Sequence, residues 1–144
     1  MIKEAHEIVY RLRLKAAPDR VFAFLATDQG RGKFWAERTE QQEQHVVFHF
    51  SDGQELSSQV LESSPSHHFS LTYFNGSIVT FDIHEEPDGT ILQLRETNLS
   101  DSDERQNRAG WVSVLLNLKA QADYEIDLRN HHPQYTWSEG YVDN

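Results

Sequence analysis

The segment from Gly110 to Ala122 constrains the fold most strongly, because it is an amphipathic helix that follows a long run of strand-like sequence. At about 100° per residue, its apolar side chains fall on one stripe. A helix with one apolar stripe must cover something, and strands with one apolar face need such a cover. We therefore expect a two-layer α+β domain around one core. The stripe consists of Trp111, Val114, Leu115, Leu118, Ala122 and Ile126.

The sequence before this helix alternates between apolar and polar residues in segments separated by turn signals. The first expected strand covers residues 7–15, with Ile8, Tyr10, Leu12 and Leu14 on one face. Strands that follow one another without intervening helices are typical of an antiparallel meander. The strongest turn signal is Asn75-Gly76, because a two-residue hairpin needs positive φ at both positions. The remaining strands are expected at residues 38–44, 45–50, 55–63, 67–74, 77–85 and 90–97.

Short helices are expected between the first strand and the meander. A proline is tolerated in the first turn of a helix, so the segment Ala16 to Arg20, which contains Pro18, reads as a helix start. Gly30 and Gly32 interrupt the pattern, and Phe34-Trp35 is expected to anchor a second short helical turn.

The parity of the strands predicts which side chains face the closing helix. The opposite parity is largely polar, as expected for a sheet with one solvated face. The predicted inward face is rich in aromatic rings and consists of Val46, Phe48, Phe50, Phe69, Leu71, Tyr73, Val79, Phe81, Ile83, Leu92 and Leu94.

Composition limits the classes of function. A chain of 144 residues fits a single domain, with a core expected at about residues 7–129 and a tail at 130–144. The net charge of −10 disfavours nucleic acid and anionic membrane surfaces as partners. The chain has no cysteine, which excludes disulfides and thiolate chemistry. No segment reads as a signal peptide or membrane span, so we expect a cytoplasmic protein, either a monomer or a homodimer.

Three short motifs occur at set places in this order of elements. They are Ala17-Pro18-Asp19-Arg20-Val21-Phe22, Phe34-Trp35, and Gly110-Trp111 followed by Leu115-Leu116-Asn117-Leu118-Lys119. With these motifs and this order, the sequence resembles the helix-grip fold, also called START-like or Bet v 1-like. It resembles in particular the homologues of the carboxy-terminal domain of the heat-shock-protein-90 ATPase activator, within the SRPBCC superfamily, from Glu7 to about Asp127.

This resemblance implies an apolar cavity between the curved sheet and the closing helix, which relatives use to hold lipids, sterols, flavonoids or polyketides. We therefore expect a small hydrophobic ligand, although core packing alone would also account for these side chains. Two other classes stay open: a co-chaperone-like interaction protein of the stress response, with a chaperone as partner, and an enzyme of cyclase or dehydratase type. The residues expected to line the cavity are Tyr10, Trp35, Phe48, Phe50, Phe69, Leu71, Tyr73, Phe81, Trp111, Leu115 and Leu118.

No motif identifies a reaction, so no catalytic residue, cofactor or metal is predicted. His45 and His49 have the spacing of metal ligands on a helix, but on a strand they lie about 13 Å apart. The best acid–base pair, Asp82 and His84, falls on the polar parity of its strand and is expected to face solvent.

One further carboxylate has inward parity. Glu96 continues the alternation of Leu92 and Leu94, which would make it a partly buried carboxylate, yet we expect it to lie past the edge of the core. The acidic run from Asp101 to Glu104 is explained by favourable charge at a helix N-terminus.

Overall fold

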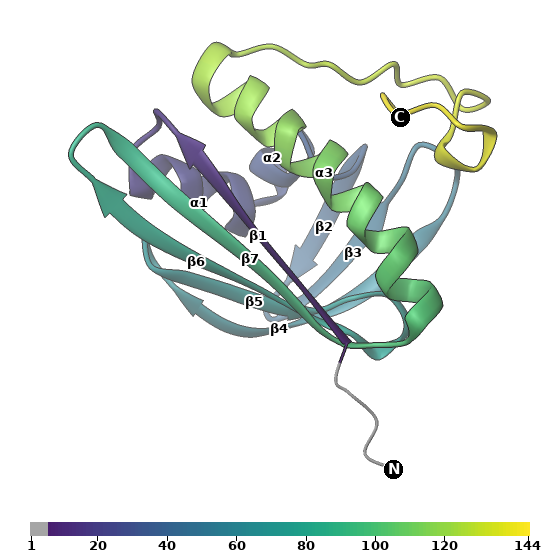
Figure 1. The fold of residues 1–144 in the computed structure, drawn as a ribbon, viewed down its shortest axis with the longest axis horizontal. Helices are drawn as coiled ribbons and strands as arrows, with labels where there is room; N and C mark the ends of the chain where they lie inside the picture. Colours follow the sequence, from purple (N-terminus) through teal and green to yellow (C-terminus); the bar gives the residue numbers. More distant parts are fainter. Residues whose placement is uncertain (1–5) are drawn as a thin grey trace.

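A seven-stranded antiparallel sheet curls around the long carboxy-terminal helix (Figure 1). This computed structural model describes residues 6–144; Met1 to Ala5, part of the segment read above as lacking a signal peptide, lie outside the described residues. The order across the sheet is β1-β7-β6-β5-β4-β3-β2. The strands are β1 (His6–Leu14), β2 (Arg38–Gln42), β3 (His45–His49), β4 (Glu55–Ser64), β5 (His68–Thr72), β6 (Ile78–Glu86) and β7 (Gly89–Leu99).

The meander is confirmed, because each strand from β2 to β6 pairs with the next one along the chain. β1 then pairs antiparallel with β7, so the first strand lies at one edge of the sheet. In the turn between β5 and β6, Asn75 and Gly76 both have the predicted positive φ, 56° and 77°, but the connection is longer than the predicted two residues, because Thr72 pairs with Ile78. At the other edge, β2 is only five residues long and exposes Arg38 and Glu40.

Two short helices, α1 (Pro18–Ala26) and α2 (Asp28–Arg31), connect β1 to β2. A second helical turn was predicted at Phe34-Trp35, but α2 lies earlier in the chain. These two residues lie in the turns that follow it. Thr27 caps α2 by accepting a hydrogen bond from the Gly30 backbone N–H at 3.0 Å. Gly30 also lets α2 pack directly on α1, since a Cβ atom there would lie 2.4 Å from the carbonyl oxygen of Ala23.

The closing helix, α3 (Asp101–Tyr124), starts at Ser100, whose side chain accepts a hydrogen bond from the Asp103 backbone N–H. Its predicted stripe is buried at Trp111, Leu115, Leu118 and Ala122 and half-buried at Val114. The placement of Ile126 on that stripe was wrong. The helix ends when Glu125 adopts a left-handed conformation, with φ of 55°, which leaves Ile126 51% exposed. No helix in residues 6–144 combines the length and apolar character that crossing a membrane requires.

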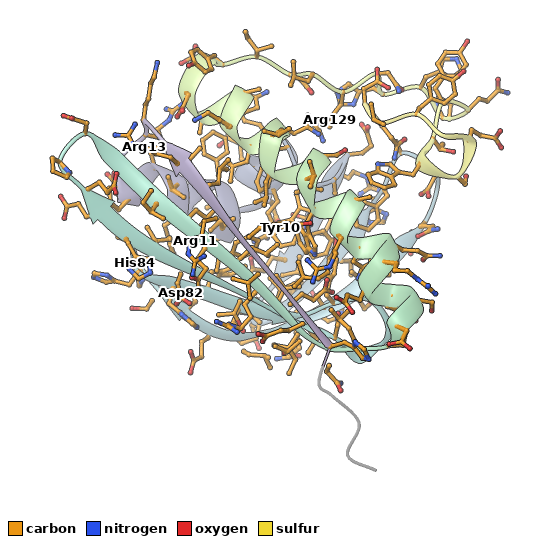
Figure 2. The ribbon with its side chains drawn as sticks, viewed as in Figure 1. Tyr10, Arg11, Arg13, Asp82, His84 and Arg129 are labelled. Atoms are coloured by element: carbon orange, nitrogen blue, oxygen red, sulfur yellow. The ribbon has the colours of Figure 1, made fainter. Side chains whose placement is uncertain are left out.

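The inward parity predicted for the sheet is confirmed, and the inward side chains form the core under α3. The alternate positions are more exposed; Asp82 is half-buried and His84 exposed, on the outer face of β6 (Figure 2). The buried inward residues are Val46, Phe48, Phe69, Leu71, Val79, Phe81, Ile83, Leu92 and Leu94, with Phe50 and Tyr73 half-buried.

The tail folds back over the molecule. After α3, residues 125–144 run along the helix toward the end of the sheet that carries β2 and β3 (Figure 1). This segment, called the strap below, contains one turn of 3-10 helix, η2 (Trp137–Glu139).

Candidate functional site

Five aromatic side chains meet between α3 and the sheet: Trp35, Phe48, Tyr73, Phe81 and Trp111. The Trp35 ring lies at the centre, with centroid distances of 4.9 Å to Phe48, 5.5 Å to Phe81 and 5.8 Å to Trp111. Trp111 also stacks on Tyr73 at 5.3 Å. These five residues, the aromatic cluster, come from the loop after α2, from β3, from the β5–β6 connection, from β6 and from α3. Each is among the residues expected to line a cavity.

Two polar groups of the cluster form a partly buried pair. The Trp35 indole N–H donates a hydrogen bond to the Tyr73 hydroxyl at 3.1 Å. Burial raises the pKa of Tyr73; the Trp35 hydrogen bond acts against this shift, and the charge of Glu96 adds to it. The Tyr73 hydroxyl therefore keeps its proton at neutral pH and can donate a hydrogen bond to an acceptor.

Glu96 lies beneath the cluster, and the expectation that it sits past the edge of the core was wrong. Its side chain is fully buried, at 0% exposure. One carboxylate oxygen accepts from the Trp111 indole N–H at 2.8 Å, and the other accepts from the Ser77 hydroxyl at 2.6 Å. The Asn107 amide donates to both oxygens at 3.1 and 3.2 Å. Three neutral donors thus surround a fully buried carboxylate, which is the kind of arrangement found at functional sites.

Only part of this site could be recognised in the sequence. Glu96 has the parity of the core, but Ser77 and Asn107 lie in a turn and on a helix, and no spacing links them to it. The structure brings all three together because β6 pairs with β7 and α3 crosses above them.

The other predicted lining residues surround the cluster without joining it. Phe50 stacks on Phe48 at 5.9 Å, whereas Phe69 contacts Phe22 of α1 at 6.4 Å. Tyr10 is half-buried on β1 (Figure 2) and interacts with Arg108 of α3. The pKa of Arg108 is raised mainly by its hydrogen bond to Glu104 and additionally by Tyr10. Three further predicted residues, Leu71, Leu115 and Leu118, are buried in the core.

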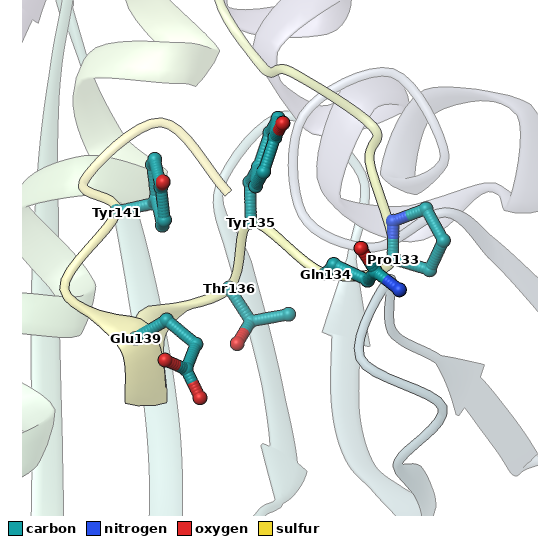
Figure 3. A pocket seen from close by; sticks show the side chains of 6 residues that line it. All are labelled: Pro133, Gln134, Tyr135, Thr136, Glu139 and Tyr141. Atoms are coloured by element: carbon teal, nitrogen blue, oxygen red, sulfur yellow. The ribbon is translucent and has the colours of Figure 1, made fainter.

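The rings of the cluster contact one another between α3 and the sheet. Two hollows are found elsewhere on the molecule. One, of about 410 Å³, lies where α1 begins, near His67 and Ile83. The other, of about 470 Å³, lies within the strap (Figure 3) and is lined by Pro133, Gln134, Tyr135, Thr136, Glu139 and Tyr141.

The acid–base pair considered from sequence is rearranged. Asp82 bonds to His68 of the neighbouring strand at 2.7 Å, and the second ring nitrogen of His68 lies 2.8 Å from Glu62. This outer-face histidine is therefore held between two carboxylates. Within residues 6–144, no three His, Asp or Glu side chains form a group that could hold a metal ion.

A curved antiparallel sheet gripping a long carboxy-terminal helix defines the helix-grip class of protein. The family model described as activator of Hsp90 ATPase homolog 1-like protein matches residues 15–123. The chain belongs to that family, and the strap lies outside the matched residues.

Solved structures with the same fold include a protein from Staphylococcus saprophyticus, with a TM-score of 0.75, 17% identity, and coverage of 84% of this chain and 94% of that one. The Aha1 dimer from Colwellia psychrerythraea has a TM-score of 0.73 and 20% identity, covering 83% and 97%. CalU16 from Micromonospora echinospora has a TM-score of 0.69 and 23% identity, covering 81% and 74%. None of the curated proteins compared with the chain matches it significantly.

Proposed function

We propose that the protein binds a small hydrophobic molecule, of the lipid, sterol, flavonoid or polyketide class, between the sheet and α3. The observation that carries this proposal is the buried carboxylate of Glu96 directly beside the aromatic cluster. A core built only for stability has no need of a buried charge, because apolar residues of similar volume stabilise as well or better. Aromatic walls with a few convergent polar groups are typical of ligand sites.

The polar groups would orient the ligand. Tyr73 carries a neutral hydroxyl that can donate, and Glu96 can accept from a ligand hydroxyl. Because the rings now contact one another, a ligand enters only if Trp35 and Trp111 separate. The bound ligand then replaces the contacts that the two rings make with each other, and burial of its apolar area drives binding.

The test is a titration of the full chain with representatives of the four ligand classes, followed by thermal unfolding and by NMR. A ligand that binds only the folded state stabilises it by about 2.7 kcal/mol at a concentration one hundred times its dissociation constant. We expect shifts of the indole N–H signals of Trp35 and Trp111, because both groups donate hydrogen bonds inside the aromatic cluster or to Glu96.

A matched pair of variants separates specific binding from surface adsorption. Phe81→Leu changes the wall of the aromatic cluster, whereas Leu61→Ala changes an exposed apolar side chain on β4. Binding that F81L weakens and L61A leaves unchanged supports the proposal. If no ligand of the four classes binds, the proposal is contradicted. The search would then turn to protein partners, of which the family description names Hsp90.

Glu96 also favours a second candidate, an enzyme of cyclase or dehydratase type, because such chemistry needs an inward carboxylate. In that case Glu96→Gln abolishes turnover of a bound compound while leaving its affinity within a few-fold. A product analysis of each ligand found in the titration decides between binding alone and catalysis.

A further inference from the structure

The strap joins two parts of the molecule that carry the tryptophans of the aromatic cluster. One part is the loop from Gly32 to Glu37, which contains Trp35, and the other is the segment of α3 around Trp111. The strap contacts both parts, and it is tied to itself by a hydrogen bond from the Asn130 backbone N–H to the Asp143 carbonyl at 2.7 Å.

Arg129 is the anchor on the loop side. Its side chain is only 5% exposed, although it lies in a segment without regular structure (Figure 2). The guanidinium donates to the carbonyl oxygen of Ala36 at 2.8 Å and to that of Gly32 at 2.9 Å. Asp127 balances its charge at 3.1 Å. These bonds fix both ends of the turn in which Trp35 lies.

A second contact ties the strap to this loop. The His131 ring lies 2.7 Å from Glu37 and 2.7 Å from Asp127, so it bridges the loop and the strap. Arg129 and His131 together form a charge-assisted clasp, and such hydrogen bonds are about twice as strong as neutral ones.

The strap contacts α3 next to the other tryptophan. The Trp137 ring lies against the backbone at Gly110, where a Cβ atom would be 3.8 Å from the ring edge. One turn further on, the Ser113 hydroxyl donates to the carbonyl oxygen of Val142 at 3.0 Å. The end of the strap reaches the turn after β3, where the Ser51 hydroxyl donates to the Asn144 side chain at 2.6 Å.

We propose that the strap is a clamp that holds the Trp35 loop and α3 together, so that its release opens the aromatic cluster to a ligand. The proposal rests on the proposed function for its ligand, but the clamp can be tested without one. It explains how a closed core can belong to a binding protein: the two tryptophans lie in contact because a separate segment fastens the elements that carry them.

The indole hydrogens of the two tryptophans report on the clamp directly. Both are buried donors, to Tyr73 and to Glu96, so they exchange with solvent only when the cluster opens. We would measure their exchange rates by NMR in the full chain, in Arg129→Ala and in Arg13→Ala. Arg13 is the matched control, because its side chain is exposed and forms an ion pair with Glu86 of β6 instead of with a strap residue.

Loss of Arg129 removes two charge-assisted hydrogen bonds, so we expect about a tenfold or greater acceleration of both indole exchange rates. Arg13→Ala should leave them unchanged. If the backbone amides of the strap exchange faster in R129A while both indoles stay protected, the clamp proposal is overturned. The same holds if R129A combined with Trp137→Ala, which removes the contact at Gly110, loosens neither the strap nor the indoles.

A milder variant, Arg129→Lys, covers the case in which R129A fails to fold. It keeps the charge but loses the planar fork that reaches two carbonyl groups, so an intermediate acceleration is expected. If the indole exchange rates of R129K equal those of the wild type although the guanidinium is lost, the proposal is contradicted.

Binding of the neutral apolar dye Nile red then tests the link to ligand entry. Faster association with R129A than with R13A, at equal helix content by circular dichroism, supports gating by the strap. If the indoles exchange faster but no variant binds the dye, the clamp proposal is supported and the proposed function is contradicted. Equal association rates despite exposed indoles overturn the gating role.

Discussion

Two carboxylates are fully buried beside α3, and their surroundings differ. Asp123, near the carboxyl end of the helix, accepts hydrogen bonds from the backbone N–H groups of Lys15 and Ala16 at 3.0 and 3.2 Å. The ammonium of Lys119 lies 3.4 Å away. Glu96, below the middle of the helix, has only the neutral side chains of Ser77, Asn107 and Trp111 around its oxygens.

The difference separates a structural carboxylate from a candidate functional one. The partners of Asp123 are fixed backbone donors and a cation, so the carboxylate joins α3 to the β1–α1 connection and its charge is compensated. Two of the partners of Glu96, the Ser77 hydroxyl and the Asn107 amide, are side-chain groups that can rotate, and all three partners are neutral. Rigid partners serve stability, whereas rotatable ones can exchange hydrogen bonds with a ligand.

The largest effect is expected for Asp123→Asn. The new amide places N–H groups against backbone N–H donors that cannot turn, and Lys119 loses its counter-charge. We expect a loss of about 3 kcal/mol in the free energy of unfolding, measured with urea. Asp52→Asn, in an exposed turn, is the control. A loss similar to that of the control would show that Asp123 does not fasten the helix to β1.

Trp111→Phe is expected to have the next largest effect. The ring that packs on Trp35 and Tyr73 is retained in smaller form, but one donor to Glu96 is lost. We expect destabilisation of about 2 kcal/mol, from the lost volume and the less satisfied carboxylate. Trp137→Phe, on the exposed strap, should cost far less in the same urea experiment. Equal losses would mean that the indole bond to Glu96 contributes little.

A smaller effect is expected for Glu96→Gln, although it is the same type of isosteric change as D123N. The Ser77 hydroxyl and the Asn107 amide can turn to accept from the new amide, and a buried charge is removed. We expect a change of about 1 kcal/mol or less. If E96Q destabilises as much as D123N, the distinction between the two carboxylates fails.

The smallest effect concerns pH and the clasp of the strap. The hydrogen bond that His131 donates to Asp127 raises the pKa of His131, burial acts against this shift, and Glu37 adds to it. Because the folded pKa is raised, the stabilisation by His131 is complete below its unfolded pKa of about 6.5 and is lost as pH rises through the folded value. Exchange of strap amides, corrected for its intrinsic pH dependence, should therefore increase across that window.

The stability of the clasp at low pH depends on Asp127. Burial acts to raise its pKa, but hydrogen bonds from the side chain and backbone of Arg129 and from His131 hold it at about 2. Its contribution is present above the unfolded pKa of about 3.9 and is lost as pH falls toward the folded value. His131→Asn, which tolerates the left-handed backbone at φ of 56°, should remove the loss at neutral pH and keep the loss in acid. An unchanged profile would exclude His131 from the clasp.

The fold could be predicted from the sequence wherever the periodicity of apolar residues matches the burial found in the structure. Alternation placed Phe81 and Leu94 inside, and the stripe of α3 placed Trp111 and Leu118 against them. The errors lie at element ends. Ile126 continues the helical spacing, but Glu125 ends the helix in a left-handed conformation without the glycine that usually marks such an end.

The candidate site was only partly predictable, because its contacts join distant segments. The rings were identified by parity, but the burial of Glu96 depends on donors from the β5–β6 turn and from α3. The strap lacks periodicity altogether. Arg129 binds the carbonyl oxygens of Gly32 and Ala36, and every residue carries such a group, so no residue type marks the partner in the sequence.

The short outer strand β2 has a consequence for behaviour at high concentration. An open sheet presents unpaired backbone groups at its edges, and a long, flat, apolar edge can recruit strands from other molecules into fibres. β2 offers only five residues, with the charged side chains of Arg38 and Glu40 exposed. Growth of fibres from this edge is therefore disfavoured, and the molecule should resist aggregation by strand addition there.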